Sequence, residues 1–277
     1  MSVPTTLIIP EVVAVTQVKT ERGNFAAHTV RATGDRQGAI LLIPGWTGSK
    51  EDFTPILPLL AAAGYDVVAY DQRGQFETPG TPTDDYSLEA LAIDALTVMA
   101  AFSHDSKFHV LGHSFGGLVA QYVALESPGR LRSLSLVCSG PGALGDSPSR
   151  PLQRISAAIG KVPLPKIHEL REQGMKRPTE IARFLAKRFV ANAPASLAAM
   201  TQHLITAPDR VDEVAALALP AWVARGANDD AWPFDAQDSM AQRLGTEVVI
   251  LPSAAHSPAV ESPEELVEAW LPFLTAH

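Results

Sequence analysis

Short, almost wholly apolar runs alternate along this chain with longer stretches in which apolar residues recur every three or four positions. Runs of this kind are typical of strands covered on both faces, and the longer spacing is typical of helices that bury one face. The predicted strands span 39–45, 65–71, 108–114, 131–140, 220–227 and 247–252. The predicted helices span 53–64, 87–102, a segment that opens at Phe115, 235–244 and a final helix.

The first thirty or so residues follow a different pattern. Segments 12–19 and 25–33 are rich in valine and threonine, and the Glu-Arg-Gly-Asn stretch at 21–24 supplies a turn between them, which predicts a β-hairpin. Together with the strand–helix alternation, this predicts an α/β fold: a mostly parallel, doubly wound sheet of about eight strands.

The final helix carries its own start signal. Ser262 stands at the N-cap position, Pro263 at the first helical position and Glu265 two residues later. This spacing predicts a capping box, in which the serine and glutamate side chains each accept a backbone N–H.

Segment 141–214 interrupts the alternation. It contains many prolines and no clear strand, and its helical patterns include Ile181, Phe184, Leu185 and Phe189. We therefore predict a core domain formed by 1–140 and 215–277, with 141–214 inserted as a helical cap or lid. The insertion holds 11 of the 22 Lys and Arg residues but only 7 of the 30 Asp and Glu residues.

Composition excludes several classes of function. A formal net charge of -8 argues against nucleic-acid binding, which needs a basic face. Cys138 is the only cysteine, so neither an internal disulfide nor a multi-cysteine metal site is available. The N-terminus lacks the basic region of a signal peptide, and no apolar window reaches the ~18 residues of a spanning helix. We expect a cytoplasmic protein without stable membrane insertion.

One stretch places a serine between glycines at a sharp turn of the backbone. Gly112-His113-Ser114-Phe115-Gly116 fits the pattern Gly-x-Ser-x-Gly, and it lies where a predicted strand meets a predicted helix. Side chains two residues either side of the serine would clash in so sharp a turn. The turn would lift Ser114 above the sheet edge, beside the free N–H groups of the helix N-terminus. Ser114 is therefore a candidate nucleophile.

A serine hydroxyl needs a base, and that base needs an orienting carboxylate. His256 lies in a loop after the last predicted strand, where parallel sheets present their catalytic groups. Asp229 and Asp230 both follow the preceding strand, and Asp146 is a third candidate acid. The order Ser114, Asp229, His256 is the one expected of a strand–turn–helix nucleophile.

With these residues in place, the chain resembles the α/β-hydrolase fold family, in particular its cap-bearing esterase- and haloperoxidase-like members. The resemblance covers nearly all of 35–140 and 215–277. The family pattern Gly-x-x-Asp-x-x-x-Pro falls on Gly226, Asp229 and Pro233, which selects Asp229. The stretch "SAAHSP" matches the family's histidine loop.

The resemblance also implies an oxyanion hole formed by the backbone N–H groups of Trp46 and Phe115. The family's usual histidine before the glycine is replaced here by Pro44, which leaves main-chain donors intact. The loop at 71–78 lacks a further glycine that relatives often carry, so its shape can differ. An aspartate nucleophile, as in dehalogenases and epoxide hydrolases of this fold, is excluded by Ser114.

We therefore expect a hydrolase without cofactor or metal, acting on a small acyl substrate with an apolar part. Ester or thioester cleavage is the leading reaction; lactone opening, C–C bond hydrolysis and acyl transfer use the same triad, and a binding or receptor protein that retains the triad is the alternative class. Monomer and homodimer both remain open. The residues expected to contact substrate are Trp46, His113, Phe184 and Trp232.

The basic insertion supports two interpretations. Its cations can simply complement an acidic core, or some of them can lie at the pocket mouth and attract anionic substrates. The candidates for the second role are Arg150, Arg154, Arg183, Lys187 and Arg188.

Overall fold

A single eight-stranded sheet runs through the molecule. The computed structural model describes residues 2–277, except for the side chains of 146–150. The strand order is β1-β2-β4-β3-β5-β6-β7-β8. The antiparallel pairs are β1 with β2 and β2 with β4, and all other neighbours are parallel. The strands are β1 Ala14–Thr20, β2 Gly23–Val30, β3 Gly38–Ile43, β4 Tyr65–Tyr70, β5 Phe108–His113, β6 Leu131–Val137, β7 Ala221–Gly226 and β8 Val248–Leu251.

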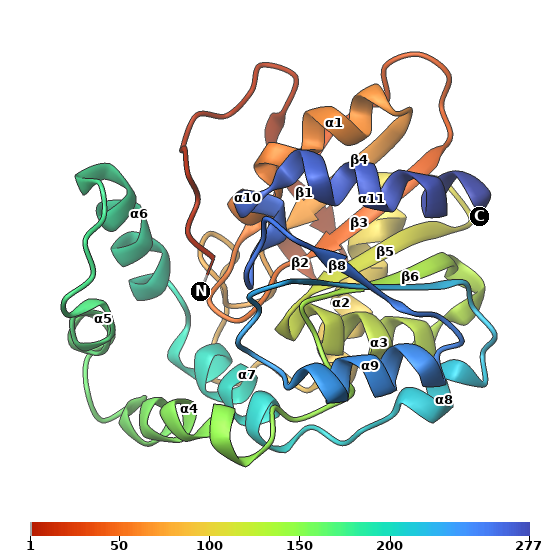
Figure 1. The fold of residues 1–277 in the computed structure, drawn as a ribbon. Helices are drawn as coiled ribbons and strands as arrows, with labels where there is room; N and C mark the ends of the chain where they lie inside the picture. Colours follow the sequence, from red (N-terminus) through yellow and green to blue (C-terminus); the bar gives the residue numbers. More distant parts are fainter. Residues whose placement is uncertain (1) are drawn as a thin grey trace.

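Helices cover both faces of this sheet (Figure 1). On one face lie η1 Lys50–Ile56, α1 Leu57–Ala62, α10 Pro258–Glu261 and α11 Pro263–Ala276, and on the other lie α2 Leu88–Phe102, α3 Phe115–Glu126, α8 Val211–Ala215 and α9 Phe234–Arg243. A short turn of helix, η2 Pro128–Arg130, precedes β6. The remaining helices are α4 Asp146–Ala158, α5 Leu164–Glu172, α6 Thr179–Val190 and α7 Pro194–Thr206.

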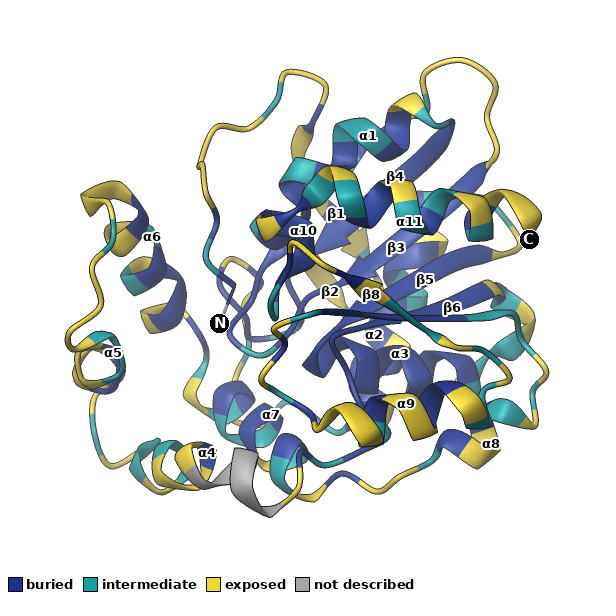
Figure 2. Ribbon diagram, viewed as in Figure 1, coloured by how far each residue is buried: buried dark blue, intermediate teal, exposed yellow. Residues whose placement is uncertain are grey.

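Burial explains why the central strands read as continuous apolar runs. Every residue of β3, β4 and β5 is buried, because each strand is covered by helices on both sides. Figure 2 shows the buried residues concentrated on the sheet and on the helix faces turned toward it. The predicted fold class, including the N-terminal hairpin and the number of strands, is confirmed.

The capping box predicted for the last helix is wrong. Ser262 is the N-cap residue of α11, but its hydroxyl makes no hydrogen bond. Glu265 turns away and accepts the backbone N–H of Ser253, at 3.2 Å to Oε2, in the loop after β8. The short helix α10 ends at Glu261 directly before this position, so the chain enters α11 from a helical turn rather than from an extended segment.

The interrupting segment 141–214 contains α4 to α7 and most of α8, and among its described residues no strand. Helices α4, α5 and α6 form an arm that lies beside the core, and α7 adjoins the core (Figure 1). Val211 and Val214 of α8 are buried in the core cluster, so the end of the segment packs as part of the core. In the described part of the chain, no helix has both the length and the apolar character needed to cross a membrane.

Candidate active site

The turn between β5 and α3 holds Ser114 in a strained conformation. Its φ is +55°, a region that L-residues rarely adopt. A Cβ on Gly112 would lie 2.2 Å from the carbonyl oxygen of Gly116, and one on Gly116 would lie 2.2 Å from that of Ile43. Only glycine fits at both positions, so the motif's glycines are explained by close backbone approach. Strain of this kind is often stored where function needs it.

Three loops bring three side chains to one edge of the sheet. Nε2 of His256, after β8, lies 3.0 Å from Oγ of Ser114. Nδ1 of the same ring lies 2.6 Å from Oδ1 of Asp229, after β7. These side chains are separated by up to 142 residues in the chain, and they meet because the carboxyl ends of parallel strands share an edge. The geometry is that of a hydroxyl, an imidazole and a carboxylate hydrogen-bonded in series.

The second oxygen of Asp229 is also satisfied. It accepts a hydrogen bond from Nε2 of Gln237 at 2.9 Å, and Oδ1 accepts the Ala231 amide at 3.2 Å. Burial alone would raise the pKa of Asp229, but the hydrogen bond and charge of His256, with these donors, hold that pKa below its usual value. Asp230 is exposed at the cavity wall, and the side chain of Asp146 lies outside the described residues.

Two main-chain amides flank the nucleophile. The loop after β3 approaches so closely that a Cβ on Gly45 would lie 3.1 Å from that of Ser114. Among the hydrogen bonds of the described residues, neither the Trp46 nor the Phe115 amide has an acceptor. Both N–H groups are therefore free to donate to a bound group.

The loop that departs from the family pattern supports the backbone that leads to the Trp46 amide. Gln72 donates to the carbonyl of Pro44 at 2.9 Å, and Gln75 donates to that of Gly45 at 3.0 Å. Sequence reasoning missed both glutamines, and it also missed Gln237. The available signal was position: Gln72 and Gln75 directly follow β4, which pairs with β3 and therefore ends beside the loop they hold.

A cavity of about 320 Å³ opens above Ser114 and His256. Trp46 and Trp232 line it, as predicted for substrate contacts, and so does the exposed Asp230. Trp46 Nε1 donates to Thr201 Oγ1 of α7 at 2.9 Å, and Trp232 Nε1 donates to the Gly142 carbonyl at 3.0 Å. Both indoles are therefore fixed by hydrogen bonds to the segment 141–214. The remaining lining residues are Leu144, Pro151, Leu152, Leu204 and Ala231.

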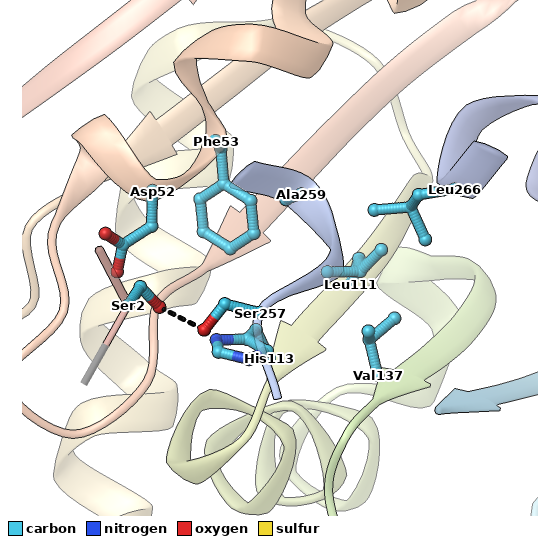
Figure 3. A pocket seen from close by; sticks show the side chains of 9 residues that line it. All are labelled: Ser2, Asp52, Phe53, Leu111, His113, Val137, Ser257, Ala259 and Leu266. Atoms are coloured by element: carbon cyan, nitrogen blue, oxygen red, sulfur yellow. Dashed lines mark hydrogen bonds between the residues drawn. The ribbon is translucent and has the colours of Figure 1, made fainter. Parts of the chain in front are cut away.

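His113 does not face this cavity, contrary to prediction. Its Nε2 donates to the carbonyl of His256 at 2.6 Å. Its ring lines a separate space of only about 10 Å³, with Phe53 and Leu111 among the walls (Figure 3). Burial, and then the nearby His256, lower the pKa of His113 to about 3. His113 is therefore a neutral donor that positions the histidine loop.

Phe184 is also absent from the cavity. It lies on α6, in the arm beside the core, and its ring packs edge-on against Phe76 at 5.7 Å between centroids. The guanidinium of Arg188 lies over the ring, 5.2 Å from its centroid. The prediction of a substrate contact at Phe184 is corrected, because its ring contacts these neighbours and does not line the cavity.

Potential metal ligands gather at the same place, but their atoms are engaged. His256 occurs in both groups of three that could hold an ion, one with His113 and Cys138 and one with the two aspartates. Both of its ring nitrogens already face Ser114 and Asp229. Burial raises the pKa of the Cys138 thiol well above its usual value, which makes this side chain a poor nucleophile.

The cations predicted for the pocket mouth lie in different places in the structure, and none of those described lines the cavity above Ser114. Arg188 is buried and donates to Asp52 Oδ1 at 2.6 Å, which ties α6 to η1 of the core. Lys187 lies 3.9 Å from Glu77, and Arg183 is exposed. Arg154 lines a second cavity, described below. The side chain of Arg150 lies outside the described residues.

Comparison with known proteins identifies the family of this chain. Residues 40–269 match the model of the alpha/beta hydrolase family. The pimeloyl-(acyl-carrier protein) methyl ester esterase of Aeromonas hydrophila is 28% identical over 241 residues, which cover 83% of this chain and 92% of that protein. A protein described as the carbamate hydrolase RutD of Variovorax paradoxus is 38% identical over 99 residues. That match covers 36% of this chain and only 37% of the relative's length.

Solved structures share the fold at low identity. A hydrolase from Pseudomonas aeruginosa PA01 superimposes with a TM-score of 0.77 at 24% identity, covering 94% of this chain and 98% of the other. A thermophilic esterase from Thermogutta terrifontis gives 0.76 at 22% identity, covering 95% and 99%. These two structures therefore share the overall fold over most of the chain.

Proposed function

The chain belongs to the alpha/beta hydrolase family and is a hydrolase, and from this premise we propose that it is a serine esterase acting through Ser114, His256 and Asp229. The observation that carries the proposal is the continuous hydrogen-bonded series from Ser114 Oγ through the His256 ring to Asp229, at 3.0 Å and 2.6 Å. Cleavage of a carboxylic ester by a covalent acyl-enzyme is the reaction this series performs best.

In the first half-reaction, Ser114 Oγ attacks the ester carbonyl carbon while its proton passes to His256 Nε2. The resulting imidazolium is stabilised by the Asp229 carboxylate, which stays ionised because its pKa is held low. The carbonyl oxygen becomes an oxyanion next to the Trp46 and Phe115 amides, donors of the kind that contribute several kcal/mol in such sites. The tetrahedral intermediate collapses when His256 returns the proton to the departing alcohol.

In the second half-reaction, water takes the place of the alcohol. His256 accepts a proton from that water as its oxygen attacks the acyl carbon, and the same two amides hold the second oxyanion. Collapse breaks the bond to Ser114 Oγ, which recovers its proton from His256. The carboxylic acid leaves and the resting series of hydrogen bonds is restored.

Three features support a small acyl substrate with an apolar part. The cavity above Ser114 is lined by leucines and two tryptophans. Leu152 of α4 and Leu204 of α7 come from the segment 141–214, so this segment acts as a cap over the site. The relative matched over most of its length is named as a methyl ester esterase. Thioester, lactone and C–C cleavage and acyl transfer are separated from ester hydrolysis by a substrate panel.

The test is covalent labelling combined with turnover. A fluorophosphonate probe should label the wild-type protein once, and Ser114→Ala should abolish both labelling and hydrolysis of p-nitrophenyl esters, by about 10⁴-fold or more. Ser253→Ala, an exposed serine in the histidine loop, serves as the matched control and should behave as wild type. Retention of a tenth of wild-type activity by a folded Ser114→Ala protein would overturn the assignment.

A further inference from the structure

Arg171 of α5 is a partly buried cation that forms no ion pair among the described residues. Its guanidinium lies over the ring of Trp46 at 4.8 Å and over that of Phe189 at 5.1 Å. Its Nη1 atom is shielded from solvent and, within the described residues, has no hydrogen-bond acceptor. The adjacent Glu172 is paired instead with Arg177, at 2.7 Å. Burial lowers the pKa of Arg171 from its usual value.

Arg171 and the nearby Arg188 differ in the partners of their guanidinium groups. Arg188 is fully buried, and it donates to the Asp52 carboxylate, to the Ser49 hydroxyl and to the Ser2 carbonyl. A buried charge normally requires such partners, because desolvation costs several kcal/mol per ion. Arg171 has two aromatic faces and the nearby charge of Glu172, but no carboxylate is paired with it among the described residues. A carboxylate from a bound molecule can take that place.

A cavity of about 510 Å³ adjoins this guanidinium, between α4 and α5. Its walls are mostly apolar, and Arg171 and the exposed Arg154 are its cations. Pro151 lines both this cavity and the one that contains Ser114. Trp46 connects them further, since it lines the Ser114 cavity and carries Arg171 on its face. The apolar walls are Ile155, Ala158, Val162, Ile167 and Leu170.

We propose that Arg171 binds the terminal carboxylate of the substrate's acyl chain, so that the enzyme is selective for monoesters of dicarboxylic acids. The proposal rests on the esterase function given above and names the substrate class of that site. The methylene chain lies along the apolar walls of the α4–α5 cavity, and the ester carbonyl reaches Ser114 past Trp46. A carboxylate matches the planar fork of a guanidinium, and it supplies the acceptor that Nη1 lacks.

The first experiment compares matched esters at several chain lengths. Monomethyl esters of the diacids from succinic to sebacic acid are compared with methyl esters of the same length that end in a primary amide, with kcat/KM measured by titration of the acid released. Wild type should prefer the carboxylate at its best length by about ten-fold or more, because hydrogen bonds to charged groups contribute on that scale. The preference should persist in high salt, since buried pairs are weakly screened.

Variants then assign the preference to one residue. Arg171→Met, which keeps an apolar body over Trp46, should lose about 10- to 100-fold in kcat/KM on the carboxylate ester and less than about three-fold on the amide. Arg171→Lys should recover part of the loss. Arg183→Met removes an exposed cation from the neighbouring helix, and it should leave kcat/KM unchanged on both esters. Equal losses on both esters in Arg171→Met, or no carboxylate preference at any length in wild type, would overturn the proposal.

A binding measurement separates this proposal from the esterase assignment. In Ser114→Ala, which cannot turn over, adipate should perturb the fluorescence of Trp46, whose ring touches Arg171, and the added Arg171→Met substitution should remove this response. If no ester is hydrolysed but the response appears, the esterase function fails and the carboxylate site stands. If esters are hydrolysed but adipate affects both proteins equally, the carboxylate site fails alone.

Discussion

Mild acid should destabilise this protein through a buried histidine of the central strand β5. His109 lies on β5, where it is 1% exposed, and its Nδ1 lies 2.7 Å from the Ser133 hydroxyl. Burial, then the charge of Arg132, lower its pKa from 6.5 to about 4. Between these values the unfolded chain binds a proton that the folded protein does not. Above pH 6.5 this histidine therefore costs the folded state nothing, and as the pH falls from 6.5 toward 4 the free energy of unfolding decreases.

The magnitude follows from the two pKa values. With 6.5 in the unfolded state and about 4 in the folded state, lowering the pH from 7 to 5 removes about 2 kcal/mol of unfolding free energy. His113, with its pKa lowered to about 3, adds a similar loss over the same range. Together the two side chains remove about 4 kcal/mol, a large part of the 5–15 kcal/mol typical of a folded protein.

The assay is urea unfolding at pH 7 and pH 5, applied to wild type, His109→Gln and His104→Gln. Glutamine keeps an amide near Ser133 but does not titrate, so His109→Gln should lose about 2 kcal/mol less than wild type over this pH interval. His104 is an exposed histidine and serves as the matched control for replacing a histidine by glutamine. The reasoning is refuted if His109→Gln and wild type respond to pH alike within about 0.5 kcal/mol.

Two further predictions concern the acid and the contact between cap and core. Asp229→Asn should lower kcat by about 10⁴-fold because an amide at that position favours the wrong imidazole tautomer, whereas Asp230→Asn should keep most activity; equal losses would contradict the assignment. Arg188→Met should lower the free energy of unfolding by about 3–5 kcal/mol, measured in urea, because it leaves the Asp52 carboxylate buried without its cation. Asp52→Asn added to it should recover part of that loss, and a single-variant effect below about 1 kcal/mol would show that the pair is not desolvated.

Local sterics made much of this protein predictable from its sequence. A wholly apolar run indicates a strand covered on both faces whatever its neighbours are, and the eight strands of the sheet follow the expected pattern. The glycines around Ser114 report a backbone approach so close that an added Cβ would lie 2.2 Å from a carbonyl oxygen. The order of Ser114, Asp229 and His256 along the chain then indicates the three side chains that the sheet edge brings within hydrogen-bonding distance.

Only the tertiary structure determined which side chains of distant segments contact one another. Phe184 and Arg171 lie in similar helical patterns, yet one packs on Phe76 and the other lies over Trp46 at the active-site cavity. The four helices α4 to α7 have no strand register to fix their relative positions, so small changes in packing select which face meets the core. The sequence therefore indicated that this segment is basic and helical, without indicating which cation is left unpaired.

Contacts between distant segments also explain why the predictions for Glu265 and His113 were wrong. Glu265 has the spacing of a capping box, but the backbone N–H of Ser253, twelve residues earlier, lies within its reach and competes for the carboxylate. His113 adjoins the nucleophile in sequence, yet strand alternation sends successive side chains to opposite faces, and its ring supports the His256 loop instead. Short-range patterns specify backbone conformation through nearest-neighbour sterics, whereas a polar side chain takes the best partner that folding brings near, and only the complete packing determines which partner that is.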